Sequence, residues 1–218
     1  MKGLLVKDIR FLMGQKASLL VSIGLGLYFM LTGADLSYAV VFSMMMAALL
    51  STSSISYDSF DNGMAFLMTL PIQKVTYVIS KYIVSLLVVV VMGAAISVVA
   101  VVCNVLGAGN VDLSMLGGGL VSAVLMAVVL MAVMIPIYII FGGEKARFAM
   151  MAIFGVVVAL GFVISRIFGD MEAKIDSLIV KLDAMNDMQL ILMGLGAIVV
   201  TMAISILITV KFLERKEY

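Results

Sequence analysis

One stretch of this chain, residues 57–82, carries charged and polar side chains that could take part in chemistry or binding. Long uncharged runs flank it on both sides. Its acidic and basic side chains are Asp58, Asp61, Lys74 and Lys81. The chain has no histidine, the commonest general base and metal ligand, so enzymatic functions lose most of their candidate residues. We therefore interpret this stretch as a water-exposed binding or coupling element rather than a catalytic centre.

Local signals divide the stretch into two short structural pieces. Asn62 and Gly63 form a break or helix C-cap signal, and Pro71 biases the residue before it away from helical angles. The apolar stripe between these breaks consists of Met64, Phe66, Leu67 and Leu70. We expect one short amphipathic helix to end near Leu70 and a new helix to begin around Pro71 and enter the membrane.

Composition places the chain in the membrane. Its 218 residues are 64% hydrophobic and 12% charged, against about 45–50% and about 25% in soluble domains. Uncharged runs of about 18 residues or more favour helices over barrel strands, which need only about 10. The net charge is only +1, and the basic residues are scattered rather than clustered in a patch, so we expect no nucleic-acid partner. The single cysteine, Cys103, excludes an intrachain disulfide.

The predicted fold is all-α, a single transmembrane domain covering residues 1–218 with six membrane-spanning helices. The uncharged runs that predict these spans are 17–34, 36–57, 82–111, 113–143, 148–165 and 188–210. Before the first span, residues 1–16 alternate basic and apolar side chains, as in an amphipathic helix lying along a membrane face. Pro136 is expected to kink the fourth span.

The distribution of lysine and arginine predicts the orientation. With six spans, both termini share one side, and that side collects Lys2, Lys7, Arg10, Lys16, Lys74, Lys81, Lys145, Arg147, Lys211, Arg215 and Lys216. The other side has only Arg166, Lys174 and Lys181. Because positive residues concentrate in cytoplasmic loops, we expect both termini in the cytoplasm of a multi-pass cell-membrane protein.

The largest external segment, 166–187, is predicted to form an amphipathic helix. Its apolar seam consists of Met171, Ile175, Leu178, Leu182 and Met185, spaced at three- and four-residue steps. This seam could rest on the bundle or on lipid headgroups, or pack against the same helix of a second subunit.

The span centres carry no acidic or basic residue, whereas ion-coupled carriers usually place such residues there. The sequence also lacks a phosphate-binding loop of the form G-x-x-x-x-G-K-[ST], so any nucleotide must be bound by another polypeptide.

The hydroxyl-rich run 51–56 could line a hydrated cavity or bond to backbone carbonyls one turn back. The twenty methionines could suit an adaptable pore lining or serve as apolar filler.

Five short motifs together resemble the six-span permease subunits of ABC-2-type exporters. They are MKGLLVKD at the start, YD at 57–58, TLPI at 69–72, SKY at 80–82 and FGGEKARF at 141–148. The resemblance covers nearly the whole chain and is strongest to the permeases of Gram-positive peptide exporters, including those that export phenol-soluble modulins.

The resemblance implies that a separate cytoplasmic ABC ATPase docks on two loops, and that permeases pair as two copies or with a sister permease. The residues that it assigns to coupling are Asp58, Asp61, Met64, Phe66, Leu67, Leu70, Pro71, Glu144, Lys145 and Arg147. The apolar ones could fill a groove on the ATPase, with Asp58, Asp61, Glu144, Lys145 and Arg147 as a charged rim. It also implies that segment 166–187 caps the exit, although this segment is more charged than a re-entrant hairpin should be.

The function that follows is a permease subunit of an ATP-driven exporter, which is not an enzyme by itself. We expect no cofactor on this chain, with ATP and magnesium bound by the partner ATPase. The expected cargo is an amphipathic peptide or another hydrophobic compound, taken from the cytoplasm or the inner leaflet, and membrane lipid is a further expected partner. The alternative is a non-transporting membrane anchor or sensor subunit that holds a cytoplasmic partner.

Overall fold

The computed structural model describes residues 2–60, 63–69, 71–108, 112–167 and 187–215. Within these ranges the chain is helical, with no strand. The elements are α1 (Lys2–Gly14), α2 (Lys16–Leu31), α3 (Leu36–Ser59), α4 (Gly63–Thr69), α5 (Lys74–Val105), η2 (Leu113–Met115), α6 (Leu116–Ile167) and α8 (Asp187–Arg215). The predicted all-α class is thus confirmed over the described residues.

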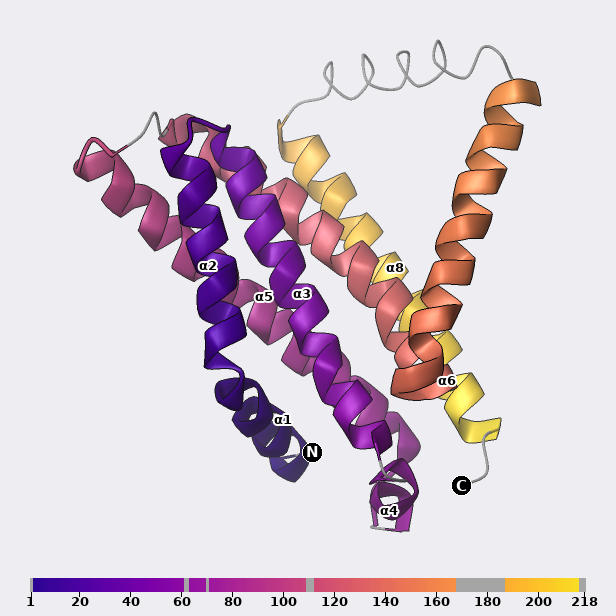
Figure 1. Ribbon diagram of the computed structural model, residues 1–218. Coiled ribbons are helices and arrows are strands. Elements are labelled where there is room, and N and C mark those ends of the chain that lie inside the picture. The colour runs from indigo at the N-terminus through magenta and orange to yellow at the C-terminus, as the bar shows by residue number, and fades with distance from the viewer. Residues whose placement is uncertain (1, 61–62, 70, 109–111, 168–186, 216–218) are drawn as a thin grey trace.

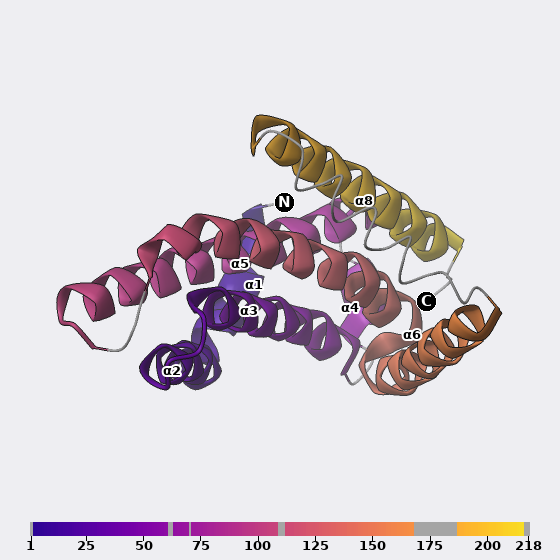
Figure 2. The same ribbon diagram turned by 90° about the horizontal axis from the view of Figure 1, so that it is seen from above.

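The helix α3 is the centre of the bundle. It packs against α2, α5 and the first part of α6, and its buried residues recur at four-residue steps, for example Ala39, Ser43, Ala47 and Ser51. Small side chains at these positions allow the neighbouring helices to approach closely. Seen along the bundle, α3 lies between α2 on one side and α5 and α6 on the other (Figure 2).

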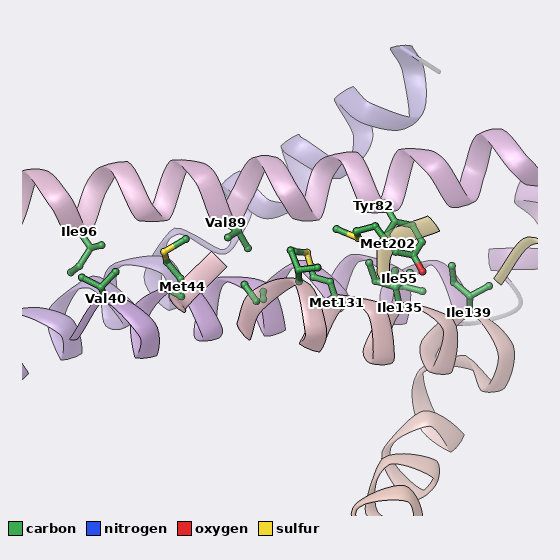
Figure 3. Packing of buried hydrophobic residues seen from close by; sticks show 14 of the residues in the cluster. Val40, Met44, Ile55, Tyr82, Val89, Ile96, Met131, Ile135, Ile139 and Met202 are labelled. Carbon is green, nitrogen blue, oxygen red and sulfur yellow. The ribbon is translucent and has the colours of Figure 1, made fainter. Parts of the chain in front are cut away.

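The apolar core is a continuous cluster between α3, α5, α6 and α8. Figure 3 shows Met44 of α3, Val89 of α5 and Met131 of α6 converging between the ribbons, with Met202 of α8 nearby. Methionines thus fill buried positions in the core, as the apolar-filler interpretation expects.

The helix α6 is two arms joined at a sharp turn. Gly142 has φ 77° and ψ 165°, which interrupts the helical geometry, and the chain reverses there (Figure 1). The predicted spans 113–143 and 148–165 occupy these two arms. The break lies at Gly142, six residues after the proline expected to kink the helix, because only glycine adopts these angles without strain.

Four helical stretches among the described residues are long and apolar enough to cross a membrane. They are Leu36–Ser59, Lys74–Val105, Leu113–Gly143 and Leu192–Arg215. α2 is shorter: its 16 residues rise about 24 Å, less than the about 30 Å of a hydrocarbon layer. α1 and α2 meet at a bend of 63° and pass the same test together, which would make five spans. The chain is a multi-pass membrane protein, and the predicted number of six spans is not confirmed.

The segments predicted to share one side of the membrane lie at one end of the bundle. α1, α4, the turn at Gly142 and the end of α8 are together at the bottom of Figure 1. The α2–α3 connection and the end of α5 lie at the opposite end. This arrangement is the one that the loop charges predicted, and which end faces the cytoplasm stays a prediction.

Candidate coupling site

The candidate site is the end of the bundle formed by α4, the turn at Gly142 and the helix ends beside them. The chain leaves α3 through Phe60, whose backbone is extended (φ −71°, ψ 143°), and starts α4 at Gly63. A Cβ on Gly63 would lie 2.8 Å from the backbone oxygen of Asp58. Glycine therefore lets α4 begin directly against the last turn of α3. The short helix lies where the sequence predicted it, ending at Thr69.

The apolar stripe predicted for α4 divides between two faces of the helix. Met64 is 7% exposed and belongs to the core, and Leu67 packs against that core. Phe66 is 68% exposed. At 100° per residue, Met64 and Phe66 lie about 200° apart, so they cannot share one face. The expectation that Met64 contacts a partner is therefore wrong, whereas Phe66 is free to do so.

Other large apolar side chains are exposed at the same end. Tyr57 and Phe60 at the end of α3 are both solvent-exposed, as are Pro71 and Phe148. The Tyr57 ring packs against Phe11 of α1, with 4.9 Å between the ring centroids. Exposed aromatic side chains that lie close together are common at interaction sites.

The second predicted coupling element, 142–148, is attached to the first by a hydrogen bond. The backbone N–H of Gly143 donates to Oγ of Ser59 at 2.8 Å. A Cβ on Gly143 would lie 2.2 Å from Oγ and 3.1 Å from Cα of Ser56, so glycine is needed for this close approach. Lys145 and Arg147 beside it are exposed, and their role in a charged rim stays a prediction. The two predicted coupling elements are therefore in direct contact.

A buried group of charges, which we call the ion-pair cluster, lies next to these two elements, at the end of α3. It consists of Lys7, Asp8, Ser54, Asp58, Tyr77 and Lys81. Lys81 Nζ lies 2.8 Å from Asp8 Oδ1, 2.6 Å from Asp58 Oδ2 and 2.8 Å from Ser54 Oγ. Asp8, Lys81 and Asp58 are 0%, 2% and 5% exposed. The cluster joins α1, α3 and α5.

The remaining contacts satisfy the two carboxylates. Asp58 Oδ1 lies 2.5 Å from Lys7 Nζ, and its Oδ2 accepts a 3.1 Å hydrogen bond from the Tyr77 hydroxyl. The Ser54 hydroxyl donates to Asp8 Oδ1 at 2.7 Å. Asp58 is therefore buried, and the expectation that it belongs to an exposed charged rim is wrong. Burying an aspartate without a cation would be costly, and here two lysines compensate it.

The sequence contained a signal for this cluster. Asp8 lies midway between Leu4 and Leu12, and all three are buried on the same face of α1. Lys81 follows Tyr77 by one helical turn and is buried with it. A charge at helical spacing within an apolar stripe indicates a buried, paired charge.

A second polar contact joins α5, α6 and α8 deeper in the bundle. The Tyr82 hydroxyl lies 2.5 Å from Ser205 Oγ and 3.2 Å from Thr209 Oγ1, and Ser205 donates to the Ala132 carbonyl at 2.6 Å. In the hydroxyl-rich run, Ser51 and Thr52 donate to carbonyls one turn back, each at 2.7 Å. Ser51 and Thr52 therefore follow the backbone-bonded alternative, whereas Ser54 of the same run bonds to Asp8 in the ion-pair cluster.

Some predicted residues fall outside what the structure describes. These are Asp61, Leu70 and the five seam residues of segment 166–187, together with the side chain of Glu144. Their proposed roles stay predictions. Within the described ranges, no group of three or more Cys, Asp or Glu side chains could hold a metal ion.

Comparison with known proteins adds one match. A family model described as ABC-2 family transporter protein matches residues 3–214, nearly the whole chain. No curated protein and no solved structure matches the chain.

Proposed function

The chain belongs to the ABC-2 family of transporter proteins, and from this membership we propose that it is the permease subunit of an ATP-driven exporter. Membrane components of this family are permeases that in general are not catalytic and work with an ABC ATPase. The proposal adds that a separate ATPase docks on α4 and the Gly142 turn, binds ATP and magnesium, and drives export.

The observation that carries the proposal is the two-sided character of α4. Its inner face, with Met64 and Leu67, is packed into the bundle, while Phe66 on its outer face is exposed. A coupling element needs both properties, because it must bind a partner and pass the partner's movement to the spans. Through Gly63 and the residues before Lys74, α4 is connected directly to α3 and α5.

The neighbouring side chains suit a protein partner. Phe60 and Phe148 are further exposed aromatic side chains at this end of the bundle, and Lys145 and Arg147 are exposed there too and supply positive charge. Protein interfaces commonly combine an aromatic centre with a polar rim. An acidic or mixed-charge groove on the ATPase would match this surface.

The cargo that we propose is an amphipathic peptide or another hydrophobic compound. Support comes from the resemblance to peptide-exporting permeases and from uncharged span centres, which offer apolar rather than ionic contacts. The second arm of α6 and the lower half of α8 present apolar side chains outward, including Phe154, Phe162 and Leu207. Such surfaces suit lipid, cargo or a second permease, and we propose that two permeases enclose the path.

The test is to reconstitute the chain with its ATPase in liposomes and to measure ATP hydrolysis with and without an amphipathic peptide. An exporter predicts that the peptide stimulates hydrolysis and crosses the membrane, and that a partner whose phosphate-loop lysine is replaced supports neither. Binding of the ATPase with no stimulation and no transport would instead identify the anchor or sensor alternative.

A further inference from the structure

We propose that the ion-pair cluster fixes α1 to the end of α3 and the start of α5, the two helix ends that α4 connects, so that α1 and α4 form one rigid unit. Lys81 is the central positioning residue of the cluster. The part of this inference that concerns α4 and the ATPase rests on the proposed function. The part that concerns α1 does not, because it follows from contacts within the chain.

Each of the three helices contributes charged side chains to the cluster. α1 supplies Lys7 and Asp8, α3 supplies Asp58, and α5 supplies Lys81. The two lysines and two aspartates balance. Lys81 Nζ has three hydrogens and contacts Asp8, Asp58 and Ser54, so each hydrogen has an acceptor.

This balance makes the placement of α1 specific. Apolar side chains such as Leu4 and Leu12 could pack against α5 in several registers at similar free energy, whereas Asp8 meets Lys81 of α5 in only one. Any other placement would leave a carboxylate and an ammonium buried apart, which is strongly unfavourable. The cluster therefore selects one position of α1 rather than only adding attraction.

The cluster also lies where movement of α4 would begin. Asp58 is one residue from the end of α3, and its backbone oxygen lies where a Cβ on Gly63, the first residue of α4, would clash. Lys81 lies seven residues after the first residue of α5, the helix that follows α4. A partner that pushes α4 must also displace the end of α3, which carries Asp58, and the start of α5, which carries Lys81. α1 is ion-paired to both of these residues.

Crosslinking tests the α1 part. With Cys103 replaced by Ala, Phe11→Cys and Tyr57→Cys place thiols on α1 and α3 where the two rings now touch. A short bifunctional thiol reagent then reports the docked position. We expect Lys81→Met to lower the crosslinked fraction about tenfold or more, because leaving one member of a buried ion pair unpaired changes an equilibrium by roughly a hundredfold.

A second substitution separates lost charge balance from general damage. Asp8→Asn combined with Lys81→Met leaves Lys7 opposite Asp58, a balanced pair, so crosslinking should recover most of its parent level. Lys16→Met, at an exposed position outside the cluster, is the matched control and should change nothing. Parent-like crosslinking in Lys81→Met, or a double variant no better than the single one, overturns the inference.

Copurification of the ATPase tests the link to α4. We expect Lys81→Met to lose the ATPase together with the crosslink, and the double variant to regain both. If the crosslink falls but the ATPase binds as in the parent, α1 and α4 are independent: the inference fails while the proposed function stands. If the parent itself binds no ATPase, the proposed function and the α4 part fail together, and crosslinking still decides the placement of α1.

Discussion

Gly143 donates its backbone N–H to Oγ of Ser59 at 2.8 Å, although the two residues lie 84 positions apart. Ser59 ends α3, and Gly143 follows the turn between the arms of α6 (Figure 1). The two loops proposed to meet the ATPase are thus in direct contact. In the proposed mechanism, this contact would pass a movement of α4 to α6 as well as to α3 and α5.

The first prediction concerns this turn. Gly142→Ala should lower the free energy of unfolding by about 1–3 kcal/mol, because φ 77° with ψ 165° is a region that only glycine adopts readily. Thermal unfolding of the purified protein in detergent measures the loss. Gly155→Ala is the control, since a Cβ there meets no atom within 4 Å. Equal unfolding midpoints for the two variants would show that the turn is not strained.

The second prediction concerns the contact between α5 and α8. Tyr82→Phe removes the hydroxyl that lies against Ser205 and Thr209, and should cost about 0.5–1.5 kcal/mol of unfolding free energy. The cost stays modest because Ser205 keeps its bond to the Ala132 carbonyl. Tyr38→Phe changes an exposed tyrosine and is the control in the same unfolding assay. A loss no larger than that of Tyr38→Phe would mean that the Tyr82 hydroxyl contributes little.

The third prediction concerns orientation. In a Cys103→Ala background, Ser114→Cys at one end of the bundle should react with a membrane-impermeant thiol reagent in intact cells. Gln73→Cys, beside α4 at the other end, should react only after the membrane is permeabilised. The opposite labelling pattern would invert the proposed topology and place α4 outside, where no ATPase could reach it.

The sequence predicted most of the fold because its signals were local. Uncharged runs located the helices, Gly63 and Pro71 bracketed α4, and the charges at 144–147 marked the turn after Gly142. The predicted number of spans is not confirmed: α2 is short and bends 63° from α1, and the second arm of α6, predicted as the span 148–165, is not among the candidate spans of the described residues. Whether such a pair crosses the membrane depends on packing and lipid, which a run of apolar letters does not record.

The site was less predictable because its contacts are long-range. Asp58 was placed on an exposed rim since its neighbours in sequence are polar, yet it is buried by Lys7 and Lys81, which lie 51 and 23 positions away. Met64 and Phe66 were assigned to one stripe by composition, and helical geometry separates them. The positions of charged residues in the sequence do not show which of them form ion pairs between helices, because that depends on how the helices pack.

The central claim is that the exposed face of α4 binds an ATPase, and Phe66→Ala tests it most directly. Losing an aromatic anchor at an interface commonly costs on the order of 2 kcal/mol or more, about a thirtyfold weaker association. Because Phe66 is 68% exposed in the free chain, the variant should fold and accumulate normally. Phe66→Leu should have a milder effect, since it keeps apolar volume.

Phe154→Ala is the matched control, because Phe154 is 71% exposed but lies on the second arm of α6, away from α4. The decisive measurement is the amount of ATPase that copurifies with each variant at equal permease abundance. We predict a large loss for Phe66→Ala and parent-like recovery for Phe154→Ala. Parent-like recovery of the ATPase with Phe66→Ala would contradict the claim and leave α4 as a plain connection between α3 and α5.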